Sequence, residues 1–429
     1  MAEIIITDQI KGIIKPMHGV GAPPQNGLTF GLFHYLTEAG IPFSRLHDAS
    51  LAASVGCHQV DVPLIFPDFN ADPEDPASYD FSFTDELMKA LHRAGVEPFY
   101  RLGVSIENYC EIRRYHIDPP SDPIRWAKIC EGIIRHYNEG WAEGFHFGIR
   151  YFEIWNEPDN HEDRHTNQMW SGTKEDYYAL YGVASRYLKD RFPDLKIGGY
   201  ASCGFYALVT DPASSPSDFA YYVDFFEGFL AYVKDNGCPL DFFSWHTYVG
   251  VPQMEVMAKY VREKLDEYGF VNTEHTLNEW NIYYDQRGTS LHSANTAAML
   301  LAMQDTTLSS AMFYDARLAV SYYAGLFNPM TRTPTPTYDC FVFFNELYKR
   351  KNQLSLTLDD GRLRAVAAKG ENDLCLVAAN MSAEPLPLTL DLGGRKIVSA
   401  KILKDDKRAE DSLFTGTIPG LAVLMITAE

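Results

Sequence analysis

Residues 150–191 read RYFEIWNEPDNHEDRHTNQMWSGTKEDYYALYGVASRYLKDR, a short apolar run, a polar loop and a longer stretch with helical spacing. Aromatic and β-branched residues ahead of a proline predict a strand over Arg150–Asn156. Apolar residues repeating every three to four positions predict a helix over Lys174–Arg191. Because a strand, a loop and a helix are the unit of parallel sheets, this stretch favours an α/β fold.

The same unit recurs between residues 13 and 350. Seven further strands are predicted, over Ile13–Val20, Pro42–Asp48, Glu97–Gly103, Lys196–Ala201, Phe242–Tyr248, His275–Asn281 and Ala311–Arg317. Stretches of helical periodicity separate them, including Phe83–Ala94, Pro123–Tyr137, Phe219–Asn236, Pro252–Tyr268 and Leu291–Leu308. Eight units with no GxGxxG pattern after the first strand predict a (β/α)₈ TIM barrel over residues 13–350 rather than an open doubly wound sheet.

After Lys351 the pattern changes to short strands separated by glycine-rich turns. The predicted strands are Arg362–Lys369, Leu374–Asn380, Leu386–Leu392, Ile397–Leu403 and Ala422–Thr427. Hairpin turns such as Asp-Gly and Gly-Gly favour antiparallel pairing. We therefore expect a small antiparallel β-sandwich domain over residues 351–429, completed by an N-terminal strand within residues 1–12.

The composition excludes several classes of protein. The chain carries 37 Lys and Arg against 57 Asp and Glu, a net charge of −20, which disfavours a nucleic-acid partner. A hydrophobic content of 46% supports a large folded core. No segment has the apolar length of a membrane span, and with Met1 as the natural start the N-terminus lacks a secretory pattern. The sequence thus predicts a cytoplasmic protein without a membrane partner.

Two glutamates end opposite strands of the predicted barrel. Glu157 follows the fourth strand and Glu279 the seventh, and alternation places Glu153, Trp155 and Glu157 on one face. Barrel enzymes carry their catalytic groups at these strand ends. Two facing carboxyl groups suit glycoside hydrolysis, in which one protonates the leaving oxygen and the other attacks the anomeric carbon. A single glutamate would more simply form a salt bridge, but the matched pair favours catalysis.

These strand ends resemble a known family. Trp155-Asn156-Glu157-Pro158 and Asn278-Glu279-Trp280 are similar to the acid/base and nucleophile signatures of the retaining glycoside hydrolases of clan A. Within that clan the chain resembles family 39, the β-xylosidase and α-L-iduronidase family. The likeness extends over most of residues 13–350, and it includes Arg45-Leu46-His47 and Ser244-Trp245-His246-Thr247-Tyr248.

The resemblance implies Glu157 as acid/base, Glu279 as nucleophile and Asn156 as the partner of the sugar 2-hydroxyl. An asparagine beside a rim glutamate points the opposite way on a regular strand, so the expectation includes a bulge at the strand end. The implied enzyme needs no cofactor and no metal, and its partner is a glycoside or an oligosaccharide. A β-xylosidase is the default, with iduronidase-like, arabinosidase-like and endo-acting enzymes and a non-catalytic carbohydrate-binding barrel as alternatives.

Further residues are candidates for substrate binding. His246 and Tyr248 share a face and are expected to reach Glu279 or the sugar, with a packed histidine and a core tyrosine as the alternative. Arg45 is expected to hold a carboxylate and His47 a sugar hydroxyl, unless Arg45 forms a purely structural ion pair. Trp280 is expected to wall the site. Tyr314 stands near the end of the eighth strand, where many clan members carry a tryptophan platform.

One motif points to different chemistry. Residues 161–165 read HEDRH, a literal match to the HExxH pattern of zinc peptidases. The match lies in a polar loop and no third ligand is evident, so zinc chemistry is a minor alternative. The sequence leaves the sugar, the linkage and the oligomeric state open.

Overall fold

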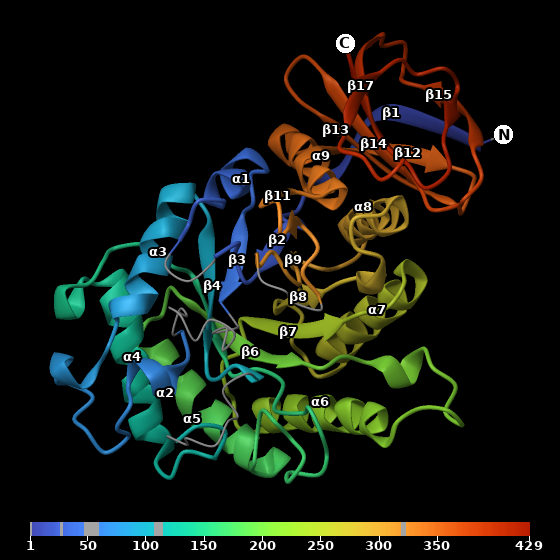
Figure 1. The fold of residues 1–429 in the computed structure, drawn as a ribbon. Coiled ribbons are helices and arrows are strands. Elements are labelled where there is room, and N and C mark those ends of the chain that lie inside the picture. The colour runs from blue at the N-terminus through green and yellow to red at the C-terminus, as the bar shows by residue number, and fades with distance from the viewer. Residues whose placement is uncertain (1, 26–28, 47–59, 107–114, 319–322) are drawn as a thin grey trace.

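The computed structural model describes the chain except for residues 1, 26–28, 47–59, 107–114 and 319–322 (Figure 1). Eight parallel strands close a barrel in the order β2 to β9. They are β2 (Gly19–Gly21), β3 (Phe43–Leu46), β4 (Glu97–Leu102), β5 (Tyr151–Ile154), β6 (Lys196–Ser202), β7 (Phe242–Thr247), β8 (Glu274–Trp280) and β9 (Ser310–Phe313). The predicted TIM barrel is confirmed.

Helices surround the barrel strands (Figure 1). They are α1 (Phe33–Glu38), α2 (Val62–Ile65), α3 (Ser82–Ala94), α4 (Pro123–Asn138), α5 (Lys174–Arg191), α6 (Ser217–Asp235), α7 (Val251–Glu267), α8 (Ser290–Gln304) and α9 (Pro336–Arg350). Local chemistry fixes their starts. The Asp122 side chain caps α4 ahead of a proline, and Thr173 and Asp176 form a capping box on α5.

The first barrel strand differs from the prediction. Residues 13–18 do not join the barrel, and β2 covers only Gly19–Gly21. Strand β1 (Ala2–Ile13) instead pairs antiparallel with β12 (Asn352–Leu358), up to the pair Ile13 and Asn352. Pro16 follows, and a proline cannot donate a ladder hydrogen bond. The apolar run that suggested a barrel strand therefore belongs partly to the other sheet.

The C-terminal strands and β1 form one nine-stranded sheet that curls around its own apolar core (Figure 1). Its remaining strands are β13 (Leu363–Lys369), β14 (Leu374–Asn380), β15 (Leu386–Asp391), β16 (Ile397–Leu403), β17 (Glu410–Ser412), β18 (Thr417–Ile418) and β19 (Val423–Ala428). Neighbouring strands pair antiparallel except β1 and β15, which run parallel. A separate hairpin joins β10 (Phe327–Asn328) and β11 (Thr333–Pro334).

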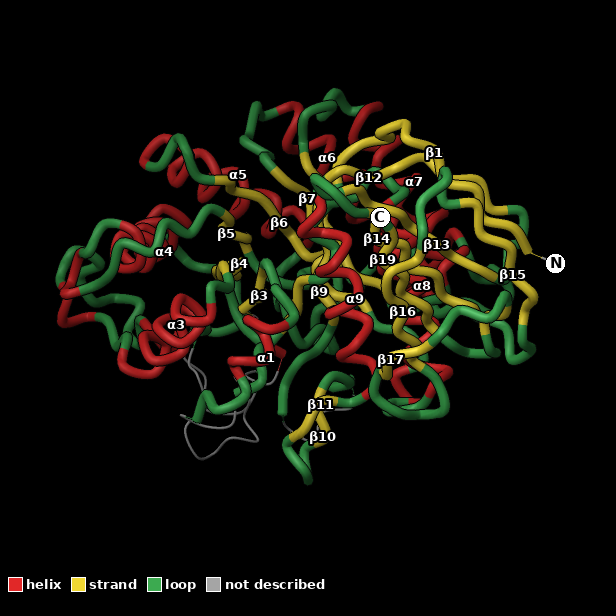
Figure 2. The backbone as a smooth tube through the Cα atoms, turned by 90° about the horizontal axis from the view of Figure 1, so that it is seen from above, coloured by secondary structure: helices red, strands yellow, loops and turns green. Residues whose placement is uncertain are grey.

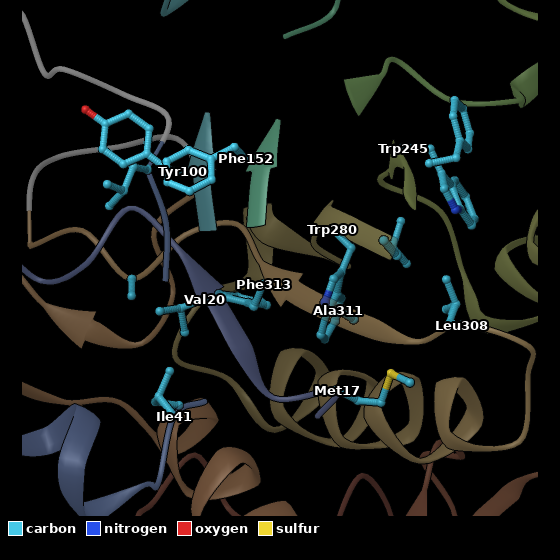
Figure 3. Packing of buried hydrophobic residues seen from close by; sticks show 14 of the residues in the cluster. Met17, Val20, Ile41, Tyr100, Phe152, Trp245, Trp280, Leu308, Ala311 and Phe313 are labelled. Carbon is cyan, nitrogen blue, oxygen red and sulfur yellow. The ribbon is translucent and has the colours of Figure 1, made fainter. Parts of the chain in front are cut away.

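Helices α8 and α9 lie between the barrel and this sheet (Figure 2). Arg408 donates to both carboxylate oxygens of Asp339 on α9 at 2.7 Å, which ties the loop between β16 and β17 to the barrel. The large core lies between barrel strands and helices, where Trp245, Trp280 and Phe313 pack (Figure 3). Inside the barrel, the lower end is filled by Phe43, Phe99, Phe242 and Met312. Arg45, Glu153 and Glu279 lie farther along their strands, toward the carboxyl ends.

Three buried histidines predict an acid-sensitive fold. Burial lowers the pKa of His18 and His275 to about 3 and that of His292 to about 4. Between pH 6.5 and about 4 the unfolded chain therefore binds protons that the folded chain does not bind, and the free energy of unfolding falls as the pH falls. We expect His292→Gln to reduce this pH dependence by up to about 1.4 kcal/mol per pH unit, measured by urea unfolding. The exposed His165→Gln should leave the slope unchanged, and an unchanged slope in His292→Gln would contradict the prediction.

Candidate active site

An irregular end of β5 directs two neighbouring side chains into the barrel mouth. The strand stops at Ile154, and Trp155 and Glu157 then adopt positive φ angles of 75° and 45°. Trp155 turns outward into the core, where its Nε1 donates to the carbonyl of Met169 at 2.8 Å. Strict alternation, which had placed Trp155 on the face of Glu153, is therefore wrong at this position. Asn156 and Glu157 both face the site, as the expected irregularity requires.

A register shift on β8 has the same effect. Between Trp245 and His246 of β7, the pairing with β8 skips a residue, so that His246 lies opposite Glu279. Glu279 consequently points into the barrel, whereas the Trp280 ring packs outward on Phe313 at 5.2 Å between centroids. Trp280 is fully buried in the core. The expectation that Trp280 walls the site is thus not met.

Arg45 on β3 joins the site residues. Its Nε and Nη2 donate to Oε2 of Glu153 at 2.8 and 2.7 Å, and Nη2 also donates to Oδ1 of Asn156 at 2.6 Å. Its Nη1 donates to Oε1 of Glu279 at 2.9 Å. Burial alone would lower the pKa of Arg45, but Glu153 and Glu279 raise it, so the guanidinium stays charged. Asn278 on β8 donates to the other oxygen of Glu153. Arg45 therefore fixes Glu279 and Asn156 in one geometry.

Glu279 has a second donor in Tyr248. The Tyr248 hydroxyl donates to Oε2 of Glu279 at 2.8 Å, while Arg45 holds Oε1. Burial, followed by the charge of Glu279, raises the pKa of Tyr248 well above 10, so the hydroxyl keeps its proton and remains a donor. Two donors stabilise the ionised form of Glu279.

Glu157 lies across the mouth from Glu279. One oxygen of each carboxyl group and a nitrogen of His246 all lie within 4.8 Å of one another. His246 Nδ1 is 2.7 Å from Oε1 of Glu157 and 3.4 Å from Oε2 of Glu279. Burial lowers the pKa of His246 to about 4, so the ring is neutral near pH 7. The Glu157 side chain is 16% exposed and that of Glu279 is 5% exposed, so Glu157 is the more accessible to solvent.

The charges at the site favour a cationic species between the carboxyl groups. Glu153 and Glu279 share the single guanidinium of Arg45. Two carboxylates as close as those of Glu157 and Glu279 resist simultaneous ionisation. The guanidinium of Arg45, 2.9 Å from Glu279, compensates part of this negative charge. The spacing of Glu157, His246 and Glu279 would also suit a metal ion. The carboxyl groups therefore suit a positively charged species between them, whether a transition state or a cation.

Tyr314 belongs to an aromatic cluster beside Tyr248. The Tyr323 ring lies 4.9 Å from that of Tyr248 and 5.5 Å from that of Tyr314, and Tyr284 lies 5.0 Å from Tyr323. The Tyr314 ring thus lies on the Tyr248 side of the mouth, and Arg317 donates to its hydroxyl at 3.1 Å. Its role as a sugar platform stays a prediction. Tyr284 and Tyr323 could not be predicted as site residues from the sequence, because isolated loop tyrosines carry no periodic signal.

Two other expectations have different outcomes. His47 lies outside the described residues. The HEDRH stretch occupies a loop of bends and turns, and His161 there lies 3.0 Å from Asp218 rather than beside His165 on a helix. Among the described residues, the one group of three or more potential metal ligands is that of Glu157, His246 and Glu279. The loop thus lacks the helical geometry of a zinc peptidase.

A family model and a known enzyme match much of this chain. The family model "Glycosyl hydrolases family 39" matches residues 53–360. A β-xylosidase of Geobacillus stearothermophilus is 24% identical over 349 residues, which cover 70% of this chain and 64% of that enzyme. This chain thus spans less than two thirds of that relative.

Solved structures show the same fold. A glucosidase from Croceicoccus marinus superposes with a TM-score of 0.78 at 20% identity, covering 100% of this chain and 98% of the other. A monomeric β-xylosidase from Caulobacter crescentus CB15 gives 0.67 at 16% identity, covering 100% and 99%. No helix in the described part of the chain is both long and apolar enough to cross a membrane. Because the family model matches residues 53–360, which are most of the 429 residues, the chain belongs to glycoside hydrolase family 39.

Proposed function

We propose that the protein is a retaining glycoside hydrolase that cleaves β-xylosides or closely related glycosides. The observation that carries this proposal is the approach of Glu157 and Glu279 to within 4.8 Å. Retaining enzymes hold their two carboxyl groups about 5–5.5 Å apart, whereas inverting enzymes leave about 6.5–9.5 Å for a water molecule. The spacing therefore favours direct attack by a carboxylate over attack by water.

In the first step, Glu279 attacks the anomeric carbon while Glu157 gives its proton to the glycosidic oxygen. The bond to the leaving group breaks, and a covalent glycosyl ester forms on Glu279. Glu279 suits the nucleophile because Arg45 and Tyr248 donate to its two oxygens and hold them in place. The more exposed Glu157 suits the proton donor because the leaving group departs toward solvent.

In the second step, Glu157 takes a proton from water, and the resulting hydroxide equivalent attacks the anomeric carbon. The ester bond to Glu279 breaks, and the sugar leaves with its original configuration. His246 is neutral near pH 7 and forms a hydrogen bond with Glu157 at 2.7 Å, so it orients the carboxyl group without adding a charge. Asn156 supports the sugar contact, since its buried Nδ2 has no partner among the described residues and can donate to a hydroxyl.

Xylose is proposed because a β-xylosidase is among the relatives of this chain. A glucosidase has the same fold, so the experiment must compare several sugars. The experiment is hydrolysis of nitrophenyl β-xyloside, β-glucoside, α-arabinofuranoside and α-iduronide, with the anomer of the first-formed sugar read by proton NMR. We expect hydrolysis of the β-xyloside with a β-product. An α-product would contradict the retaining mechanism. Binding of xylo-oligosaccharides without hydrolysis of any glycoside would favour the non-catalytic carbohydrate-binding barrel.

A further inference from the structure

We propose that Asp159 is a positioning residue for Glu157, which fixes the turn after β5 so that the Glu157 carboxyl group can protonate the leaving oxygen. This inference rests on the proposed function. Asp159 lies two residues beyond Glu157 and is fully buried. No hydrogen bond or ion pair of Asp159 with a lysine or arginine appears among the described contacts, and its hydrogen bonds instead run to the end of the neighbouring strand β6.

Four hydrogen bonds tie the turn to the end of β6 and to Cys203 directly after it. The backbone N–H of Glu157 donates to the carbonyl of Ala201 at 3.0 Å. Asp159 accepts from the Ser202 hydroxyl at 2.7 Å and from the Cys203 N–H at 3.2 Å. Asn160 connects Glu157 with Cys203, since its Nδ2 donates to Oε2 of Glu157 at 3.4 Å and to Sγ of Cys203 at 3.7 Å. The Asp159 carboxyl group thus anchors the turn to the end of β6, while the Glu157 carboxyl group faces the barrel mouth.

The turn needs such an anchor because its backbone is unfavourable. Trp155 and Glu157 both adopt positive φ angles, which side-chain-bearing residues rarely adopt. Such conformations persist only where surrounding contacts enforce them. Without the Asp159 bonds, the turn can relax toward a regular strand end, which would move the Glu157 carboxyl group away from the leaving oxygen.

Asp159 also costs stability, as expected for a residue kept for function. Burial raises the pKa of Asp159 to about 7, the charge of Glu157 adds to this, and the bonds from Ser202 and Cys203 oppose it. The other titratable groups that face it are Tyr177 and Tyr178 of α5, Tyr221 and Tyr222 of α6, Tyr200 of β6 and Cys203 directly after β6. Burial raises the pKa of each of these six groups, so they are neutral near pH 7 and leave the Asp159 charge uncompensated.

The first experiment measures how the effect of Asp159→Ala depends on the leaving group. The kcat/KM for a dinitrophenyl glycoside reports a bond cleavage that needs little protonation, whereas a methylphenyl glycoside needs a proton from Glu157. We expect Asp159→Ala to lower kcat/KM about 10- to 100-fold for the methylphenyl substrate and less than about 3-fold for the dinitrophenyl substrate. Asp159→Asn keeps an acceptor for Ser202 and should lose less. Asp163→Ala, an exposed aspartate on the same loop, is the control.

The outcomes separate the inference from the proposed function. Equal losses on both substrates would mean a merely structural role, and no loss on either would mean no role; both overturn the inference. A wild-type protein that hydrolyses neither glycoside would overturn the proposed function and the inference together. Should Asp159→Ala not fold, the same comparison is made with Asp159→Asn and Ser202→Ala, whose loss must again be confined to the methylphenyl substrate.

A second readout uses thermal unfolding of Asp159→Asn at different pH values. Because the folded-state pKa lies near 7 and the ordinary value is 3.8, the wild type loses stability as the pH rises from about 4 to 7. The asparagine variant lacks this loss, so its melting temperature should exceed that of the wild type most at pH 8 and by less at pH 5. The opposite result would be a difference between variant and wild type that is smaller at pH 8 than at pH 5. It would mean that the Asp159 charge is compensated, and it would contradict the argument.

Discussion

Replacing Glu279 with alanine is expected to lower kcat by about 10⁴-fold or more, because the variant lacks the carboxylate that forms the covalent ester. The vacated volume lies between Arg45 Nη1 and the Tyr248 hydroxyl, two donors that suit a small anion. Added azide should therefore enter and attack the anomeric carbon directly, giving a glycosyl azide of inverted configuration. The measurement is hydrolysis of the preferred nitrophenyl glycoside with and without azide, with the product identified by NMR.

Glu157→Ala separates the two roles. A good leaving group departs without the acid, so the glycosyl ester still forms and azide then gives a product of retained configuration. Glu274→Gln is a matched control for Glu279, since it lies at the opposite end of β8 and pairs with Lys196. The exposed Glu162→Gln controls for Glu157. Full activity in Glu279→Ala, or a retained azide from it, would refute the assignment.

Replacing Arg45 with methionine is expected to destabilise the fold by about 3–5 kcal/mol and to abolish activity. The substitution removes the cation shared by Glu153 and Glu279, whose side chains are 0% and 5% exposed, and leaves both charges without compensation. It also removes the hydrogen bonds from Arg45 to Asn156 and to Oε1 of Glu279. Urea unfolding measures the first effect and kcat the second.

The double variant Arg45→Met/Glu153→Gln tests the cause. Because it removes one uncompensated charge, it should be more stable than Arg45→Met alone, though still inactive. Arg150→Met is the matched control, since Arg150, which directly precedes β5, pairs with Glu97 of β4. The two side chains are 59% and 22% exposed, so the variant should lose at most about 1 kcal/mol. A double variant no more stable than the single one would show that packing, and not charge, accounts for the loss.

Much of the fold can be predicted from local sequence patterns. The predicted helix Lys174–Arg191 matches α5 residue for residue, and predicted strands such as Lys196–Ala201 and Phe242–Tyr248 match β6 and β7 within one residue at each end. Strand and helix periodicities are properties of a few consecutive residues, so they can be recognised without knowing which elements pack together. The pairing of β1 with β12 joins residues more than 330 positions apart, such as Ile13 and Asn352, and no local pattern contains it.

The candidate site divides in the same way. Strand patterns predict that Glu157 and Glu279 end facing barrel strands, and alternation along one strand predicts that His246 and Tyr248 share a face. The outward turn of Trp155 and Trp280 emerges only in the folded chain, since the backbone at both strand ends departs from alternation. The tertiary structure also decided the role of Arg45, which bonds residues 108, 111 and 234 positions away. A buried charge takes whichever partners the closed barrel brings within hydrogen-bond distance, and that distance is set by the packing of all eight strands.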